Sequence, residues 1–144
     1  MGEAGITLYT VGSIKDIVGI KKYVNIDGGM FDNPRFALYN AKYEAVVANR
    51  ASESLNELVS LAGKCCESGD MIAENLLLNE PKVGDIIAVF TTGAYNYSMS
   101  SHYNSNFVPP VLLVDGDNKG LIVRPETYED IVAKDIVPDW LDKE

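Results

Sequence analysis

Short runs of apolar and β-branched residues recur along this chain, and glycines or polar turn residues separate them. The clearest run covers residues 6–11, with Gly5 before it and Gly12 after it. Runs of this length and composition are typical of β-strands. Residues 71–78 fit either a strand or a helical turn. Further strands are predicted over residues 13–18, 22–26, 43–49, 58–61 and 86–91.

A hairpin is predicted late in the chain. Residues 111–114 and 121–124 are apolar runs that flank the polar stretch 115–120, so we expect two antiparallel strands joined by a loose polar loop. After the hairpin, Thr127 precedes Asp130 by three residues. This is the spacing of a capping box, in which both side chains satisfy free backbone N–H groups, and it predicts the start of one late helix.

Many short strands and few helical signals indicate the fold class. We predict a mainly β domain, a Greek-key-like barrel or sandwich with one or two short helices. The chain has 144 residues, of which 47% are hydrophobic, and this fits one domain with one core. We expect the domain to cover residues 1–137 and residues 138–144 to form a flexible tail.

Composition and charge exclude several functions. The formal net charge is −9 and no cluster of basic residues is present, so we expect no nucleic-acid partner. No apolar run approaches the ~18 residues that span a bilayer, and the first residues lack the basic start of a secretory signal. We therefore expect a cytoplasmic protein without membrane contact. Cys65, Cys66 and His102 cannot build a structural zinc site, and no metal is expected.

Arg35 is the first candidate functional residue. It follows the turn-forming pair Gly28-Gly29 and comes directly after Pro34, which restricts the backbone. A guanidinium presented from such a stiffened loop suits two-point recognition of a carboxylate or a phosphate. From the spacing alone, an ordinary surface arginine in a loop is the more common explanation.

Two cysteines and a glutamate form the second candidate. Cys65 and Cys66 precede Glu67, and a thiol beside a carboxylate can act in acid–base or nucleophilic chemistry. A neighbouring carboxylate raises the pKa of a thiol, which favours a proton donor over a nucleophile. The alternative is that free cysteines are small buried apolar residues. The pattern favours this alternative for Cys65, whereas both interpretations stay open for Cys66.

Two tyrosines form the third candidate. Tyr95 and Tyr97 follow Gly93, just after the apolar run 86–91. A tyrosine combines a flat apolar face with a polar tip, so it can present a phenol to a ligand. The pattern alone favours the alternative, in which the rings pack over the end of the core.

Three groups of residues in this order resemble the C-terminal part of the diaminopimelate decarboxylases. The resemblance extends over essentially the whole chain. Each group alone is a weak signal, but the three in register are specific. They are DGGM with NPR (27–30 and 33–35), CESGD (66–70) and TGAY (92–95).

The resemblance implies an activity, a cofactor and a larger architecture. Members of this fold-type III family use pyridoxal 5′-phosphate to convert meso-2,6-diaminopimelate to L-lysine and CO2. They have an N-terminal (β/α)8 barrel of about 250 residues, a typical size for that fold, which carries the Schiff-base lysine. This chain resembles the C-terminal β domain, with the barrel missing. We therefore expect the fragment alone to be inactive. In family members a cysteine and a glutamate of the C-terminal domain reach the active site of the opposite subunit, which implies a homodimer with shared active sites.

The resemblance also implies roles for single residues. Arg35 matches an arginine that binds a substrate carboxylate, and Tyr39 matches a tyrosine that contacts the substrate. Cys66 matches the proton donor. Glu67 matches the acid that holds the distal ammonium group of the substrate, and Tyr95 matches a tyrosine that touches both cofactor and substrate.

Two other functions stay open. The first is a decarboxylase of another basic amino acid, such as ornithine, lysine or arginine. Those relatives usually carry Cys-Asp where this chain has Cys66-Glu67, and they lack Arg35 in its Asn-Pro-Arg context. The second is a non-catalytic, decarboxylase-like binding module, which would not need Arg35, Cys66, Glu67 and Tyr95. A generic β-barrel ligand-binding domain would not explain the three groups in register.

Overall fold

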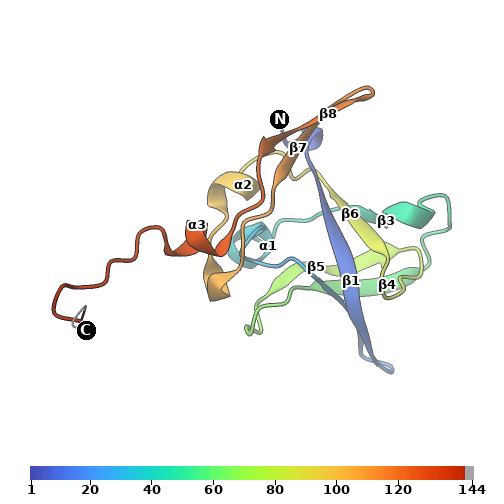
Figure 1. The fold of residues 1–144 in the computed structure, drawn as a ribbon. Coiled ribbons are helices and arrows are strands. Elements are labelled where there is room, and N and C mark those ends of the chain that lie inside the picture. The colour runs from blue at the N-terminus through green and yellow to red at the C-terminus, as the bar shows by residue number, and fades with distance from the viewer. Residues whose placement is uncertain (142–144) are drawn as a thin grey trace.

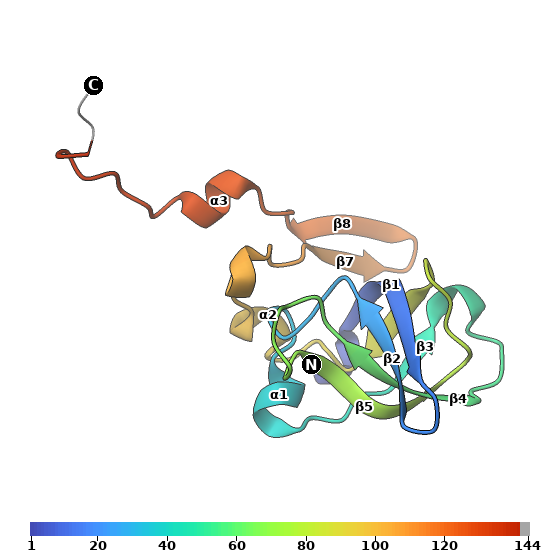
Figure 2. The same ribbon diagram turned by 90° about the horizontal axis from the view of Figure 1, so that it is seen from below.

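Eight β-strands form most of the regular structure in residues 1–141, the part of the chain that the computed structural model describes (Figures 1 and 2). They are β1 (Ile6–Ile17), β2 (Lys21–Ile26), β3 (Ala45–Val47), β4 (Glu57–Ala62), β5 (Met71–Leu78), β6 (Ile86–Phe90), β7 (Val111–Asp115) and β8 (Asn118–Val123). The α-helices are short: α1 (Arg35–Tyr39), α2 (Asn96–Met99) and α3 (Tyr128–Val132). The prediction of a mainly β domain is confirmed.

Six of these strands form one sheet in the order β3-β6-β1-β2-β4-β5. All neighbouring pairs are antiparallel except β2 and β4, which run parallel. The edge strands β3 and β5 lie in contact with each other, so the sheet curls into a nearly closed barrel. Closure protects the edges of a sheet and encloses the side chains of its inner face.

β1 is longer than the sequence pattern predicts. The prediction of separate strands over residues 6–11 and 13–18 is wrong, because the register shifts between Val11 and Ser13 while the strand continues. This irregularity is a β-bulge at Gly12, which bends the strand instead of ending it. Residues 6–10 pair with β6, and the part after the bulge pairs with β2.

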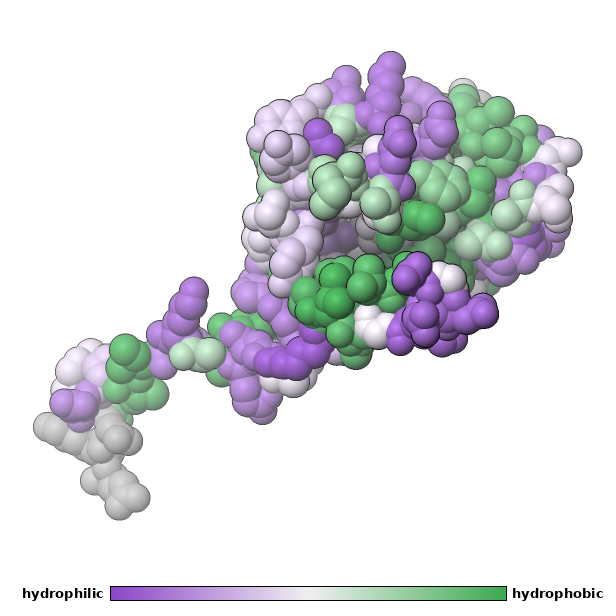
Figure 3. Space-filling model, turned by 90° about the horizontal axis from the view of Figure 1, so that it is seen from above, coloured by the Kyte–Doolittle hydropathy of each residue, from purple (hydrophilic) through white to green (hydrophobic). Residues whose placement is uncertain are grey.

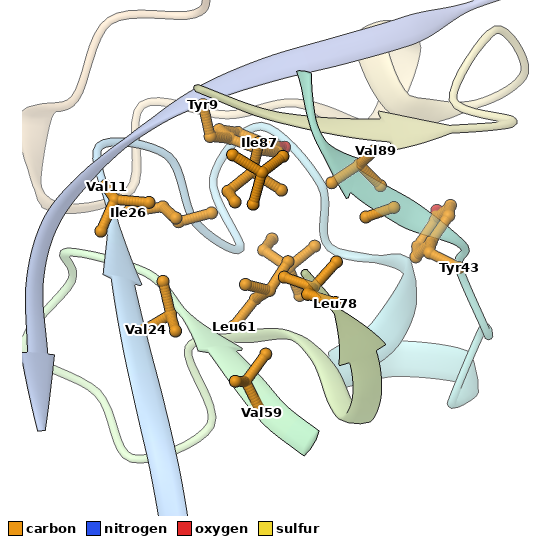
Figure 4. Close-up of a cluster of buried hydrophobic side chains, with 13 residues drawn as sticks. Tyr9, Val11, Val24, Ile26, Tyr43, Val59, Leu61, Leu78, Ile87 and Val89 are labelled. Carbon is orange, nitrogen blue, oxygen red and sulfur yellow. The ribbon is translucent and has the colours of Figure 1, made fainter. Parts of the chain in front are cut away.

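Aliphatic side chains from all six strands of the sheet fill the barrel interior (Figure 4). Successive residues of a strand point to opposite faces. On β2, Val24 and Ile26 are therefore buried, and on β4 Val59 and Leu61 are buried while Leu58 is 59% exposed. Burying each such aliphatic side chain contributes about 1.5–3 kcal/mol to folding.

Two other segments differ in detail from the sequence pattern. Residues 71–78, which fit a strand or a helical turn, form β5. The predicted strand over residues 43–49 is shorter, because only Ala45–Val47 is a strand and a 3-10 turn follows over Ala48–Arg50. The backbone N–H of Val47 donates to the side chain of Asn79, 3.0 Å away, where the ladder of the sheet ends.

β7 and β8 form a separate two-stranded sheet. The hairpin was predicted correctly, but its loop is tighter than expected. Asp115 pairs with Asn118, so the turn consists of Gly116 and Asp117, with Gly116 at φ +57°. A two-residue hairpin turn needs positive φ, and glycine adopts it without strain.

The C-terminal segment leaves the barrel after the hairpin (Figure 2). α3 begins at the predicted capping box of Thr127 and Asp130. The domain boundary at residue 137 and the flexible tail over residues 138–144 stay predictions, and residues 142–144 lie outside the described part of the chain. No helix within residues 1–141 is both long enough and apolar enough to cross a membrane.

Candidate functional site

The topology brings the three candidate segments to one end of the barrel. They are the β2–α1 loop (residues 27–34), the β4–β5 loop (residues 63–70) and the β6–α2 loop (residues 91–95). β4 runs parallel to β2. β6 also runs in the direction of β2, because both are antiparallel to β1. All three loops therefore leave the carboxyl ends of strands that point the same way.

Arg35 is held at the start of a helix rather than inside a loop. It is the first residue of α1, and Pro34 occupies the N-cap position with φ −77°. The Arg35 side chain is half-buried, and its Cζ atom lies 5.7 Å from the centroid of the Tyr95 ring. A guanidinium over an aromatic face is attracted by the ring quadrupole. Two candidates from distant parts of the sequence thus meet. In the ribbon, α1 lies near α2, the helix that follows Tyr95 (Figure 1).

Tyr95 has an unusual backbone conformation. It is the N-cap residue of α2 with φ +69°, in the left-handed region that few residues other than glycine adopt. Its side chain is 68% exposed, and that of Tyr97 is 54% exposed. The interpretation that these rings pack over the end of the core is therefore wrong. The backbone instead presents the Tyr95 phenol to the surface beside Arg35.

A close contact of glycines fixes the loop that carries Tyr95. A Cβ atom on Gly5 would lie 2.3 Å from the Cα atom of Gly93, so both positions need glycine for the two segments to approach. The backbone N–H of Thr92 donates to the carbonyl of Gly5 at 3.0 Å. The first turn of the chain therefore braces this loop.

Cys66 and Glu67 lie at the tip of the β4–β5 loop, and both are exposed. The Glu67 carboxylate accepts a hydrogen bond from the backbone N–H of Gly69 at 2.9 Å, which orients it within the loop. Cys65 differs from its neighbour, because it is partly buried. Burial, followed by the negative charge of Asp70, raises the pKa of the Cys65 thiol to about 11. Cys65 is therefore a protonated thiol at neutral pH.

Tyr39 lies one turn after Arg35 on α1, and i, i+4 residues share a face of a helix. Its side chain is 64% exposed. The five candidates thus lie on an open surface. A cavity of about 420 Å³ between α1 and β5 includes none of them. Its walls are Phe36, Asn40, Ala41, Lys42, Tyr43, Ala73, Glu74, Asn75 and Leu76.

Two buried aspartates support the loops, and the sequence pattern did not single them out. Asp70 is 2% exposed and Asp32 is 5% exposed. Asp70 accepts hydrogen bonds from the backbone N–H groups of Met30 and Cys65. Polar residues in glycine-rich segments ordinarily face solvent. Asp70 belongs to the CESGD group, which the sequence analysis did single out. Nothing in the sequence pattern indicated that its carboxylate is buried.

Asp32 holds the β2–α1 loop against the barrel. It accepts hydrogen bonds from the Tyr9 hydroxyl and, at 2.6 Å, from the backbone N–H of Gly29. Burial raises the pKa of Asp32 to about 6, although these hydrogen bonds stabilise its ionised form and oppose the rise. Burial also raises the pKa of Tyr9.

A family model described as "Pyridoxal-dependent decarboxylase, C-terminal sheet domain" matches residues 3–93. The match contains all six strands of the barrel, α1 and the β4–β5 loop, and it ends two residues before Tyr95. The chain therefore belongs to this family of pyridoxal-dependent decarboxylase C-terminal sheet domains.

The similar full-length proteins have a more specific activity. The chain is 55% identical to the diaminopimelate decarboxylase of Bacillus subtilis over 136 residues, which are 94% of this chain and 31% of that protein. The crystal structure of diaminopimelate decarboxylase from M. jannaschii matches with a TM-score of 0.88 and 39% identity, covering 97% of this chain and 32% of that one. The Helicobacter pylori enzyme matches with a TM-score of 0.82 and 32% identity, covering 92% of this chain and 32% of that one. The chain spans about a third of the length of the curated relatives it matches.

Asp32 generates a prediction for the pH dependence of stability. Folding raises its pKa from 3.8 to about 6, so the folded state binds the proton more tightly than the unfolded state. The contribution of Asp32 to stability is then full at low pH and is lost as the pH rises through about 6. In the variant Asp32→Asn, the side chain at this position is uncharged at every pH. Between about pH 4 and 7 the variant should gain roughly 1–3 kcal/mol in free energy of unfolding relative to the wild type.

Urea unfolding of both proteins at a series of pH values measures this difference. Asp27→Asn is a matched control, because Asp27 lies in the same loop but is exposed. It shows what the same substitution does at an exposed carboxylate of this loop. A difference between Asp32→Asn and the wild type that does not change with pH would contradict the raised pKa of Asp32.

Proposed function

We propose that this chain is the C-terminal domain of a diaminopimelate decarboxylase, an enzyme that converts meso-2,6-diaminopimelate to L-lysine and CO2. The observation that carries the proposal is the gathering of Arg35, Tyr95 and the Cys66–Glu67 loop at one end of the barrel. The diaminopimelate decarboxylases of M. jannaschii and H. pylori have been solved in complex with L-lysine, the product of this reaction. The matched relatives support the same activity for the full-length protein.

Arg35 and Glu67 are proposed to select the substrate. Diaminopimelate carries an amino acid group at each end, so the end that does not react presents both a carboxylate and an ammonium. The Arg35 guanidinium can bind that carboxylate through two parallel hydrogen bonds. The Glu67 carboxylate can accept hydrogen bonds from the ammonium. A substrate without the distal carboxylate would leave Arg35 unpaired, and this disfavours its binding.

Cys66 is proposed to donate the final proton. Pyridoxal phosphate, when bound, supplies the electron sink that makes loss of CO2 possible. After CO2 leaves, its bonding electron pair stays on the substrate α-carbon, which must gain a proton. The Cys66 S–H group can donate that proton from an exposed loop tip, and the thiolate then recovers a proton from water.

Tyr95 fits the edge of a cofactor site. Its exposed phenol can donate a hydrogen bond to the cofactor, while the Arg35 guanidinium beside its ring is left to bind the substrate carboxylate. The groups in this chain can contribute to a cofactor site, but they are too few to bind the cofactor alone. The Schiff-base lysine and most phosphate contacts are therefore proposed to come from an N-terminal (β/α)8 barrel. That the chain alone is inactive stays a prediction.

Apolar residues on the surface support the proposal of further partners. β7, β8 and α3 expose a group of aliphatic and aromatic side chains, part of which forms the green area in Figure 3. Such an area is typical of a surface that another domain or subunit covers. We propose that it packs in a cytoplasmic homodimer whose subunits share active sites. The exposed residues include Leu112, Leu113, Val114, Leu121, Ile122, Tyr128 and Val132.

The alternatives are less well supported. A lysine/ornithine decarboxylase from Vibrio vulnificus matches with 24% identity and a TM-score of 0.61, which shows a shared fold alone. Arg35 and Glu67 favour diaminopimelate over a substrate with a single carboxylate. A non-catalytic binding module would not need the exposed Cys66 and the strained backbone at Tyr95.

Arg35→Lys should weaken catalysis in the full-length enzyme. An ammonium group cannot make the two-point contact with a carboxylate, so kcat/KM for diaminopimelate should fall. The fall should correspond to a loss of about 2–4 kcal/mol in transition-state binding. Arg124→Lys is the control, because Arg124 is exposed and pairs with Asp130 beside α3. Steady-state kinetics of CO2 release measure both. An unchanged kcat/KM in Arg35→Lys would exclude Arg35 as the carboxylate ligand.

The two cysteines should differ in function. Cys66→Ala should reduce kcat of the full-length enzyme by about 100-fold or more, the usual contribution of a positioned proton donor. Cys65→Ala should keep kcat and lose about 1 kcal/mol of stability, because it removes a partly buried group. Turnover and urea unfolding of both variants check this. Equal losses of turnover would show that Cys66 has no special role.

A further inference from the structure

A pair of buried asparagines joins the loop before Arg35 to the helix after Tyr95. Asn33 lies two residues before Arg35 and is 0% exposed, and Asn96 directly follows Tyr95 and is 5% exposed. The side-chain nitrogen of Asn33 donates a hydrogen bond to the side-chain oxygen of Asn96 at 3.1 Å. One direct contact between two amides thus connects positions that are more than 60 residues apart.

Both amides have further partners. The side-chain nitrogen of Asn96 faces the carbonyls of Ala94 and Thr92, at 3.1 and 3.3 Å, and this is the amide orientation that gives its polar atoms suitable partners. The side-chain oxygen of Asn33 accepts a hydrogen bond from the Tyr43 hydroxyl at 3.0 Å. Hydrogen bonds are directional, and an unpaired buried amide is costly. The network therefore fixes how the two segments lie against each other.

A backbone hydrogen bond joins the same two segments beyond the other end of α2. The N–H of Ser101, two residues after the last residue of α2, donates to the carbonyl of Phe31 in the β2–α1 loop at 2.8 Å. Asn96 is the first residue of that helix. The β2–α1 loop thus holds α2 at both ends, so the helix cannot shift relative to the loop without breaking one of these contacts.

These contacts adjoin two side chains of the proposed site. The Cζ atom of Arg35 lies 5.7 Å from the centroid of the Tyr95 ring. We propose that Asn33 and Asn96 are positioning residues for substrate selection, because they set the Arg35 guanidinium against the Tyr95 ring and so fix the place where the distal carboxylate binds. This inference rests on the proposed function. All four residues belong to one chain, so the arrangement does not depend on which subunit supplies the β4–β5 loop.

A third buried asparagine provides a matched control. Asn79 is 1% exposed, accepts a hydrogen bond from the backbone N–H of Val47 at 3.0 Å, and donates one to the carbonyl of Arg50 at 2.9 Å. It follows β5, which runs antiparallel to β4. Asn79 therefore lies at the end of the barrel away from the candidate site. Asn79→Leu should lower the unfolding temperature and leave ligand binding unchanged.

Two inhibitors of the full-length enzyme isolate the recognition of the distal carboxylate. L-lysine retains this carboxylate, whereas cadaverine is the same molecule without it. Asn96→Leu has nearly the size of asparagine but makes none of its side-chain hydrogen bonds. The Ki of L-lysine and the KM of diaminopimelate should rise by about 10-fold or more, as for other small displacements of binding groups. The Ki of cadaverine should stay nearly unchanged, and Asn79→Leu should change neither Ki.

A milder variant keeps the test informative if Asn96→Leu folds poorly. Tyr43→Phe removes only the hydroxyl that donates to Asn33. It should raise the Ki of L-lysine by a smaller factor and again leave that of cadaverine unchanged. Adding Tyr43→Phe or Asn96→Leu to Arg35→Lys should cause little further rise, because the asparagines act through the guanidinium. Independent effects would multiply.

The outcomes separate this inference from the proposed function. A wild-type full-length enzyme that releases no CO2 from diaminopimelate would refute both, and an unchanged Ki of L-lysine in Arg35→Lys would refute the role proposed for Arg35. If Arg35→Lys raises this Ki while Asn96→Leu and Tyr43→Phe leave it unchanged, the positioning role alone is wrong. Equal rises for L-lysine and cadaverine in Asn96→Leu would also refute that role, because they would indicate a general disturbance of the site.

Discussion

The Asp70 carboxylate is the contact on which the candidate site most depends. A charge removed from water is stable only where hydrogen bonds replace its hydration. Here backbone N–H groups from two loops donate those hydrogen bonds. The bonds that stabilise the carboxylate therefore also hold the two loops in place. Gly29 and Gly63 permit the approach. A glycine of the DGGM group is therefore needed to leave room for the aspartate of the CESGD group.

The barrel supplies the frame for this contact. Because β2, β4 and β6 point the same way, their following loops meet without a long connection. At this end the Arg35 guanidinium lies beside the Tyr95 ring, and a separate loop carries an exposed thiol and an exposed carboxylate. In the proposed function these groups bind and protonate a substrate that a second domain holds. This matches a chain that spans about a third of its decarboxylase relatives.

The sequence was sufficient for the fold class and for most strands, because alternating burial follows directly from apolar periodicity, as on β2. It failed where tertiary contacts decide the structure. Gly12 looked like a break but is a bulge, because β1 changes partners there. The local pattern pointed to Arg35, Cys66, Glu67 and Tyr95, and the motif resemblance added Tyr39 and the roles of all five. Their supports, Asp32 and Asp70, were missed because polar residues among glycines look like exposed turns until the barrel buries them.

Hydrogen exchange of single backbone amides in the 144-residue chain tests the central contact most directly. Amides held by buried acceptors exchange slowly, at rates that report local opening. The Met30 and Cys65 amides should be protected in the wild type, and both should lose protection in Asp70→Ala. The Lys82 amide, which donates to Asp85, should stay unchanged in that variant. If the Met30 or Cys65 amide keeps its wild-type rate in Asp70→Ala, Asp70 does not hold the two loops together.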